Sequence, residues 1–326
     1  MKRAVVLLTL PALLAVSAVL LVIELTSSDE PSPQPGALIS SASAQAASSS
    51  ALAPTSSSSS APTESDEAAS PEATDRKKKN KKKKKKQKKP KKPKKRKAPP
   101  PLPDVEGAVT ISAVGDIVMG TPLFGFPPEE GKTFFDAVEP LLDGDLVLGN
   151  LEGTLSSGGV PRCNAEAKNC FSFQTPPSYA RWLSKAGFTT LNLANNHAYD
   201  FGAGALEQTR AALRQRGLRH TGAPGQITVH RVGKIRIAVV GFSTYRWSAD
   251  LRDIDAASKL IKEAGRHGHV VVVTMHAGAE GAQHTHVRRG VERFLGQNRG
   301  DPVRFAHAAV DAGADLVVGH GPHVLR

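Results

Sequence analysis

The sequence predicts an α/β domain over residues 104–326, in which strands and helices alternate along the chain. Short apolar segments of strand length are separated in this region by segments of helical periodicity. Such alternation is typical of a largely parallel sheet whose two faces are covered by helices. Polar side chains follow several of the apolar segments, and the length of the region suits one domain of ordinary size.

The predicted strands are short runs rich in valine, isoleucine and leucine. They cover residues 109–114, 145–149, 189–194, 270–274 and 315–318. Residues 227–232 and 235–240 are expected to pair as a hairpin, because Gly233 and Lys234 between them favour a tight turn.

The predicted helices follow these strands and carry recognisable end signals. They cover residues 134–142, 178–185, 203–216, 254–264 and 302–312. Ser178 is expected to cap the second helix, and Gly187 is expected to end it. Pro302 fits the first turn of the last helix, where its missing N–H costs no hydrogen bond.

Residues 1–26 are expected to form a signal anchor with one transmembrane helix. The apolar run from Ala4 to Ile23 is long enough as a helix to span a hydrocarbon core of about 30 Å. A cleaved signal peptide is the alternative, but its apolar core is usually only about 7–15 residues long. Lys2 and Arg3 precede the run, so we expect a single-pass protein of the cell membrane, with its folded domain outside the cytoplasm.

Residues 27–103 are expected to be a disordered stalk, because a composition of serine, alanine and proline cannot offset the entropy of ordering. Within it, residues 76–97 hold 16 Lys and 2 Arg, whereas the chain from residue 98 has 23 basic and 22 acidic residues. This Lys-rich tract lacks aromatic residues for base stacking and follows the predicted anchor, so nucleic acid is not an expected partner. An anionic cell-surface polymer or lipid headgroups are expected instead, with a solvated spacer as the alternative.

Five predicted strands end on side chains that bind metals or transfer protons. These are Asp116, Asn150 with Glu152, Asn195 to His197, His276, and His320 with His323. Each has an ordinary interpretation when taken alone, such as a turn residue or a buried core histidine. Parallel strands would bring all of them to one edge of the sheet, and their convergence there predicts a site.

The mixture of carboxylate, amide and imidazole groups favours Mn, Zn or Fe over Ca or a thiolate-bound zinc. A divalent ion of this kind lowers the pKa of bound water and holds phosphate oxygens, while an unligated histidine serves as general acid or base. The seven histidines that lie in predicted loops or helices receive no role.

Several motifs resemble those of the CapA-type capsule synthesis family, which is associated with poly-γ-glutamate and related to the calcineurin-like metallophosphoesterases. They are Ala113 to Asp116, Gly149 to Gly153, Asn195 to Asp200, and Gly313 to His323. The resemblance runs from about Val109 to the end of the chain. It implies a four-layer αββα sandwich like that of the metallophosphoesterases, with two stacked sheets and helices outside.

The resemblance also implies roles for individual residues. The implied ligands of one or two divalent ions are Asp116, Glu152, Asn196, His276, His320 and His323. His197 resembles the histidine that protonates the leaving oxygen. Other capsule-synthesis membrane proteins are the implied protein partners.

The chain departs from the superfamily pattern at two motifs. Val118 stands where the superfamily has the histidine of Asp-x-His, and His320 and His323 are spaced more widely than in Gly-His-x-His. The capsule family shares both departures, which argue against assuming ordinary phosphoesterase activity. Family members continue beyond the position of Arg326, so we expect the domain to be truncated there.

Two hypotheses about function follow. One is a metal-dependent hydrolase or transferase that acts on phosphoester or polymer-end groups during capsule or cell-envelope polymer biosynthesis. The other is a non-catalytic factor that binds or anchors the capsule polymer. Cys163 and Cys170 lie in one polar loop, and a disulfide is expected if the domain is outside the cell, with two free thiols as the alternative.

Overall fold

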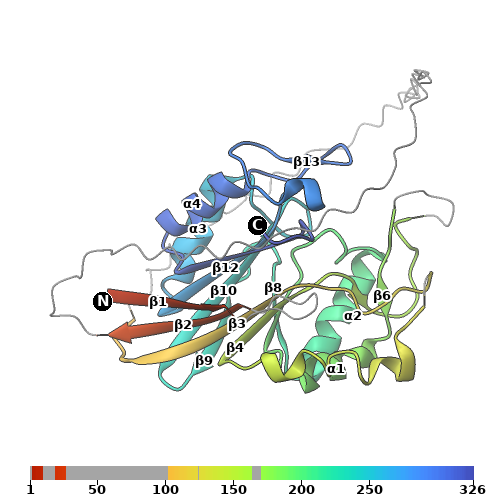
Figure 1. Ribbon diagram of the computed structural model, residues 1–326, viewed down its shortest axis with the longest axis horizontal. Helices are drawn as coiled ribbons and strands as arrows, with labels where there is room; N and C mark the ends of the chain where they lie inside the picture. The colour runs from red at the N-terminus through yellow and green to blue at the C-terminus, as the bar shows by residue number, and fades with distance from the viewer. Residues whose placement is uncertain (1, 10–18, 27–101, 124, 164–169) are drawn as a thin grey trace, which may run out of the picture. The chain divides into compact units, whose positions relative to one another are not determined.

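A computed structural model describes residues 2–9, 19–26, 102–123, 125–163 and 170–326 (Figure 1). All of them belong to one compact unit, which consists of Met1–Asp29 and Ala98–Arg326. The expected stalk, including the Lys-rich tract at 76–97, lies outside the described residues except at its end.

The first sheet contains six strands in the order β1-β2-β3-β4-β7-β8. They are β1 (Lys2–Thr9), β2 (Val19–Thr26), β3 (Gly107–Ile117), β4 (Leu146–Leu151), β7 (Thr190–Asn192) and β8 (Arg219–Thr221). The last four run parallel to one another, and β1 and β2 join as antiparallel strands beside β3.

The second sheet has a parallel centre and one antiparallel strand. Its members are β11 (Ala249–Asp250), β10 (Ile235–Ser243), β12 (Val270–His276), β15 (Leu316–His320) and β9 (Thr228–Val232). The first four are hydrogen-bonded in that order and run parallel, whereas β9 pairs with β10 as the predicted hairpin.

The two sheets bury their apolar side chains against each other. Alternate residues of β3 and β4, such as Ile111 and Leu148, form one core with Ile237 and Val272 of the second sheet. This follows from the period of two in a strand, which sends every second side chain to the same face.

The outer face of each sheet is covered by helices, as Figure 1 shows. The core on the first sheet includes residues of α1 (Ala180–Lys185) and α2 (Gly202–Gln215). The core on the second includes residues of α3 (Ile254–Ala264) and α4 (Pro302–Asp311). The described residues thus form a mixed α/β sandwich with parallel sheets.

The N-terminal segment differs from the expected helix over residues 4–23. The structure has the paired strands β1 and β2 in the described parts of this segment. The segment is rich in valine and leucine, and β-branched valine also fits a strand, so apolar character alone does not separate the two states. Within the part of the chain that the structure describes, no helix is both long and apolar enough to cross a membrane.

Most predicted elements are confirmed, but the helix over 134–142 is wrong. That segment consists of turns and the 3-10 helix Glu139–Leu141, and Pro140 has no N–H to continue an α-helix. Ser178 lies inside the 3-10 turn Pro177–Tyr179 and does not cap α1, whereas Gly187 ends α1 in a left-handed conformation with φ of 92°.

Four short features were not predicted. They are β8, β11, the pair β5 (Thr154–Leu155) with β6 (Gln174–Thr175), and the hairpin of β13 (Arg293–Phe294) with β14 (Gln297–Asn298). Strands of two or three residues give no periodicity in a sequence.

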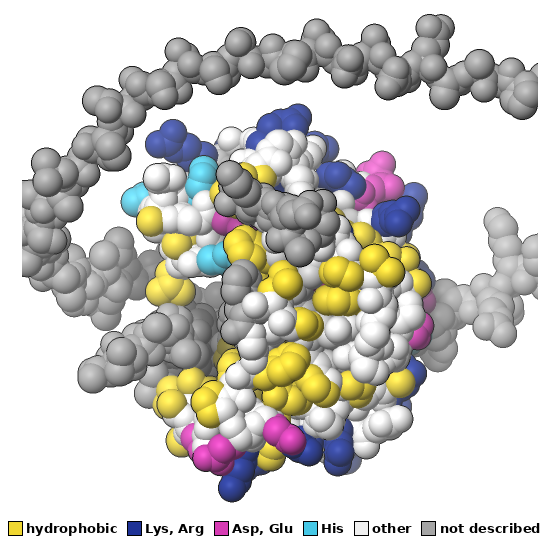
Figure 2. Space-filling model, turned by 90° about the vertical axis from the view of Figure 1, so that its right-hand side faces the viewer, with side chains coloured by type: hydrophobic (Ala, Val, Ile, Leu, Met, Phe, Trp, Pro, Cys, Tyr) yellow, Lys and Arg dark blue, Asp and Glu magenta, His cyan; other side chains and the backbone are white. Residues whose placement is uncertain are grey.

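The face shown in Figure 2 carries patches of hydrophobic side chains, with basic and acidic groups interspersed around its rim. This mixture agrees with the near balance of 23 basic and 22 acidic residues from residue 98 onward. The basic character of the whole chain therefore belongs to the Lys-rich tract rather than to the folded domain.

Candidate metal centre

The predicted site residues lie at the carboxyl ends of strands in both sheets. In the first sheet, Asp116 of β3 is in register with Asn150 of β4, after a register shift that follows Ala113. In the second, His276 at the end of β12 is in register with His320 at the end of β15. Parallel pairing brings together residues that are far apart in the sequence, as expected for α/β sheets.

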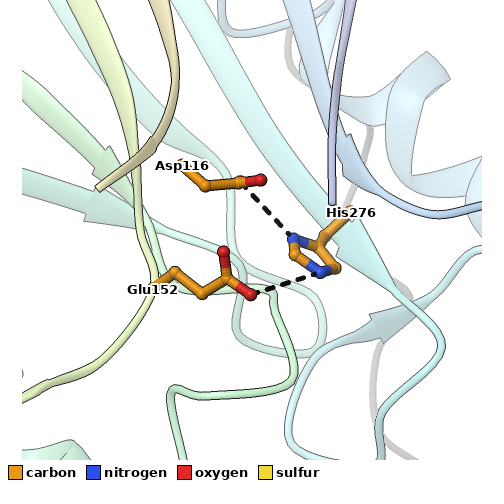
Figure 3. A group of neighbouring side chains, drawn as sticks. All are labelled: Asp116, Glu152 and His276. Atoms are coloured by element: carbon orange, nitrogen blue, oxygen red, sulfur yellow. Dashed lines mark ion pairs between the residues drawn. The ribbon is translucent and has the colours of Figure 1, made fainter. Parts of the chain in front are cut away.

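Asp116, Glu152 and His276 form a compact group of candidate ligands (Figure 3). One ligand atom from each of these residues lies within 4.8 Å of the others. His276 Nδ1 is 3.9 Å from Asp116 Oδ1, and His276 Nε2 is 3.8 Å from Glu152 Oε1. The imidazole therefore lies between two carboxylates contributed by the other sheet.

His323 approaches the same carboxylates from the turn after β15. Its Nε2 is 3.7 Å from Asp116 Oδ2 and 3.7 Å from Glu152 Oε2. The turn is tightly constrained, because Gly321 N donates to Asp116 Oδ2 at 3.0 Å and a Cβ on Gly321 would lie 2.8 Å from His276 Nε2. His323 itself has a φ of 57°, which is costly for a residue with a side chain and often marks a functional position.

Buried polar atoms without partners show that the site suits a cation. Within the described residues, no hydrogen-bond partner is present for Glu152 Oε1, Asn196 Oδ1, His276 Nε2, or either ring nitrogen of His320. All four residues are at most 9 % exposed. Buried polar groups without hydrogen bonds are costly, and an ion held by oxygen and nitrogen atoms would satisfy them.

An amide network holds the carboxylates in place. Asn150 Nδ2 donates to Asp116 Oδ1 at 2.6 Å and lies 3.2 Å from His276 Nδ1. Asn192 and Asn195 donate to Asn150 Oδ1 at 2.8 and 3.1 Å. These amides are buried and hydrogen-bonded to one another. They therefore hold Asp116 of the first sheet next to His276 of the second.

His197 lies beside the candidate ligand group. One of its ring nitrogens faces Glu152, and the other faces the buried carboxylate of Asp200. Its Nε2 is 3.8 Å from Glu152 Oε1, and its Nδ1 is 2.7 Å from Asp200 Oδ2. Asn195 Oδ1 accepts a hydrogen bond from the His197 backbone N–H at 3.0 Å, and the ring packs against Phe173 at a centroid distance of 4.4 Å. The imidazole is thus held by Asp200 and Phe173, while Asn195 holds the backbone of the same residue.

The charges of the site shift its pKa values in opposite directions. Burial disfavours the charged carboxylate of Glu152, but His276, His323 and His197 outweigh this and lower its pKa to about 2. Burial lowers the pKa of His276 to about 4 and also lowers that of His320. The neighbouring carboxylate of Glu152 raises the pKa of His323 to about 9.

Residues that flank a disulfide bind the carboxylate that holds His197. Cys163 and Cys170 are bonded, as expected. Just before the loop, Arg162 forms an ion pair with Asp200 Oδ1 at 3.3 Å and donates to Asn196 O at 2.8 Å. Just after it, Phe173 N donates to Asp200 Oδ2 at 2.8 Å.

The structure brings together the predicted ligands and adds residues that the sequence did not single out. Asp116, Glu152, His276 and His323 lie around one point. His320, beside His276 in the sheet, and Asn196, next to His197 in the chain, are buried and have ligand atoms without hydrogen bonds among the described residues. Asp200, Glu280 and Arg299 were not predicted. A sequence signal existed for Asp200, three residues after His197, but none marks Arg299, which lies far along the chain.

The fold and the site define a layered α/β protein with a candidate metal centre where the parallel strands of two sheets end. Residues 110–326 match the family described as bacterial capsule synthesis protein PGA_cap. The chain belongs to this capsule synthesis family, and the resemblance of its motifs to CapA-type proteins is confirmed.

Three relatives illustrate the similarity. The chain is 28 % identical over 240 residues to the PGA biosynthesis protein CapA of Bacillus subtilis, covering 68 % of this chain and 59 % of that protein. It is 30 % identical over 240 residues to the capsule biosynthesis protein CapA of Bacillus anthracis, with 67 % and 55 % covered. A probable polyglutamine synthesis accessory protein of Mycobacterium tuberculosis is 28 % identical over 211 residues, with 56 % and 50 % covered. The chain thus spans between half and three-fifths of these relatives.

Proposed function

We propose that the protein is a metal-dependent hydrolase or transferase that acts on phosphoester or polymer-end groups during biosynthesis of a capsule or cell-envelope polymer. The observation that carries this proposal is the group of Asp116, Glu152 and His276, whose ligand atoms lie within 4.8 Å of one another and include buried atoms without hydrogen bonds. Membership of the capsule synthesis family and the names of the relatives support the polymer context.

The chain's own residues divide the work in this proposal. Asp116, Glu152, Asn196, His276, His320 and His323 would hold one or two divalent ions, with Mn, Zn or Fe as the candidates. Such an ion supplies a polarised substrate oxygen and an activated water or nucleophile. His197, in its doubly protonated form, would deliver the Nε2 proton to the leaving oxygen, because Nδ1 keeps its hydrogen bond to Asp200 and Nε2 is turned toward Glu152.

The enzyme hypothesis is tested on the full-length chain. Metal content is measured by elemental analysis after purification, and hydrolysis of a generic phosphodiester is compared for wild type and His197→Ala. We expect bound metal in both proteins and a rate lower by about 10²–10⁴-fold in the variant. Absence of metal together with equal rates would overturn the proposal.

A second candidate function is favoured by one observation. Val118 stands where related phosphoesterases have a histidine ligand, and this side chain cannot bind a metal. A polymer-binding factor without catalysis would keep the metal centre and need no complete second metal site. Metal-dependent binding of an anionic polymer by His197→Ala as strongly as by wild type, without turnover by either, would favour this function.

The location of the protein is part of the proposal. We infer attachment to the cell membrane through residues 1–26 from the apolar run and the flanking charges of Lys2 and Arg3. Insertion into a bilayer and pairing of β1 and β2 with β3 are mutually exclusive states of this segment. Membrane fractionation with protease protection distinguishes them, since release from washed membranes would exclude the anchor.

The Lys-rich tract at 76–97 would hold an anionic surface polymer or lipid headgroups near the domain. Deletion of the tract should weaken retention on an anionic envelope fraction at low salt, and the difference should shrink at high salt. Unchanged retention of the deletion variant would show that the tract acts only as a spacer.

A further inference from the structure

A buried arginine near the metal centre has no role in the function proposed above. Arg299 is 3 % exposed and lies beyond the β13–β14 hairpin. Its guanidinium forms an ion pair with Glu280, donates to the Tyr245 hydroxyl, and donates to Gly278 O at 3.3 Å. A buried charge is costly unless it is paired and hydrogen-bonded, so this arrangement fixes the arginine and its partner carboxylate together.

The partner carboxylate reaches the metal centre through a histidine. Glu280 Oε2 lies 3.7 Å from His323 Nδ1, on the opposite side of the ring from Asp116 and Glu152. Glu280 follows β12 by four residues, and its segment is tied to the turn of His323 because Gly281 N donates to Pro322 O at 2.9 Å. The two loops therefore keep a fixed separation.

The geometry of His323 requires such a support. Its Nε2 faces both carboxylates of the candidate ligand group, so a metal at that nitrogen leaves the proton on Nδ1. A histidine that binds a metal usually donates this second N–H to a carboxylate, carbonyl or water, which fixes the ring and its tautomer. His323 needs this help more than a strand residue would, since it stands in a left-handed turn and its side chain is 48 % exposed.

We propose that Glu280, held by the buried Arg299, is the positioning residue that orients His323 toward the metal centre. The inference rests on the proposed function, because it requires that the centre binds a divalent ion. It adds a chain of contacts that runs from Tyr245 through Arg299 and Glu280 to His323. It also explains why a buried arginine is paired with a half-buried carboxylate beside the site. Neither Glu280 nor Arg299 touches the metal in this proposal.

The test measures Zn²⁺ affinity of the full-length chain by calorimetric titration. Glu280→Ala should weaken binding by about 10–100-fold, whereas Glu280→Gln should weaken it less because an amide oxygen can accept a hydrogen bond from Nδ1–H once the metal fixes the ring. Glu263→Gln is the matched control, since Glu263 pairs with Arg266 and His267 on the surface of α3. Its affinity should equal that of wild type.

A double-mutant cycle shows whether Glu280 acts through His323. In a His323→Ala background, Glu280→Ala should cause no further loss of affinity. The ¹⁵N signals of labelled histidine provide a second readout: wild type with Zn²⁺ should show His323 protonated at Nδ1, and Glu280→Ala should lose that signature while its far-UV circular dichroism is unchanged.

The outcomes separate the two proposals. Wild type that binds no divalent ion would overturn both the metal centre and this inference. Wild type that binds Zn²⁺, together with a Glu280→Ala variant of equal affinity, would overturn this inference alone. Additive losses of Zn²⁺ binding free energy in Glu280→Ala and His323→Ala would also contradict this inference, because Glu280 would then act independently of His323.

Discussion

The Asp200 carboxylate lies 2.7 Å from His197 Nδ1, and both residues belong to the same turn after β7. Asp200 is completely buried, and its carboxylate also contacts Arg162 and the Phe173 backbone N–H. The carboxylate therefore accepts a hydrogen bond from Nδ1–H on one side of the imidazole, and the other ring nitrogen faces Glu152.

The first prediction concerns this carboxylate. Asp200→Asn should lower phosphodiester hydrolysis by about 10²–10⁴-fold, because an amide also donates hydrogen bonds and no longer fixes the histidine tautomer. Initial rates at saturating metal check this. Asp250→Asn, which affects a surface pair with Arg252, serves as the control and should keep the wild-type rate. Equal rates for both variants would contradict the prediction.

Metal binding should stabilise the folded chain. An ion that binds only the folded state at 100 times its dissociation constant adds about 2.7 kcal/mol to the free energy of unfolding. Thermal melts of chelator-treated protein, with and without added Mn²⁺ or Zn²⁺, measure this effect. Asp116→Asn should reduce the metal-induced shift in melting temperature; an undiminished shift would place the ion elsewhere.

The unfolding free energy of metal-free protein should depend on pH in both directions. His323 has a folded pKa of about 9 against 6.5 when unfolded, so its stabilisation is complete below pH 6.5 and is lost as pH rises toward 9. His276 has a folded pKa of about 4, so the stability it contributes above pH 6.5 is lost as pH falls toward 4. Urea unfolding across this range tests both signs.

His323→Asn should remove the loss of unfolding free energy at alkaline pH and leave the loss at acid pH in place. If this variant lost the same unfolding free energy at alkaline pH as wild type, another titrating group would be responsible for that loss.

The disulfide should stabilise the fold and hold together the two flanking segments that contact Asp200. Closing the short loop between Cys163 and Cys170 corresponds to about 2–3 kcal/mol in the chain-entropy account. Replacing both cysteines by serine should lower the free energy of unfolding by that amount in urea titrations. A reducing agent should have the same effect on wild type and none on the variant; a reductant effect on the variant would indicate another cause.

Sequence periodicity predicted the main elements of the fold because they are long. Strands such as β10 and β12 are continuous apolar runs, and α2, α3 and α4 repeat apolar residues at helical spacing. The prediction of a helix over 134–142 was wrong because Pro140 and local turns outweighed the apolar pattern of this segment. At the N-terminus, the apolar run fits a helix or paired strands, and its composition did not choose between them.

For the site, local patterns along the chain were enough to identify the ligand types and their positions at strand ends. Asp116, Glu152, His276 and His323 were recognisable because each follows a strand or lies in a motif. The contacts that support these ligands are visible only in the folded protein. Asp200 is buried between the two ends of a disulfide-closed loop, and Glu280 is fixed by Arg299 from beyond a hairpin. Such contacts join positions that no local pattern connects, so packing alone determines them.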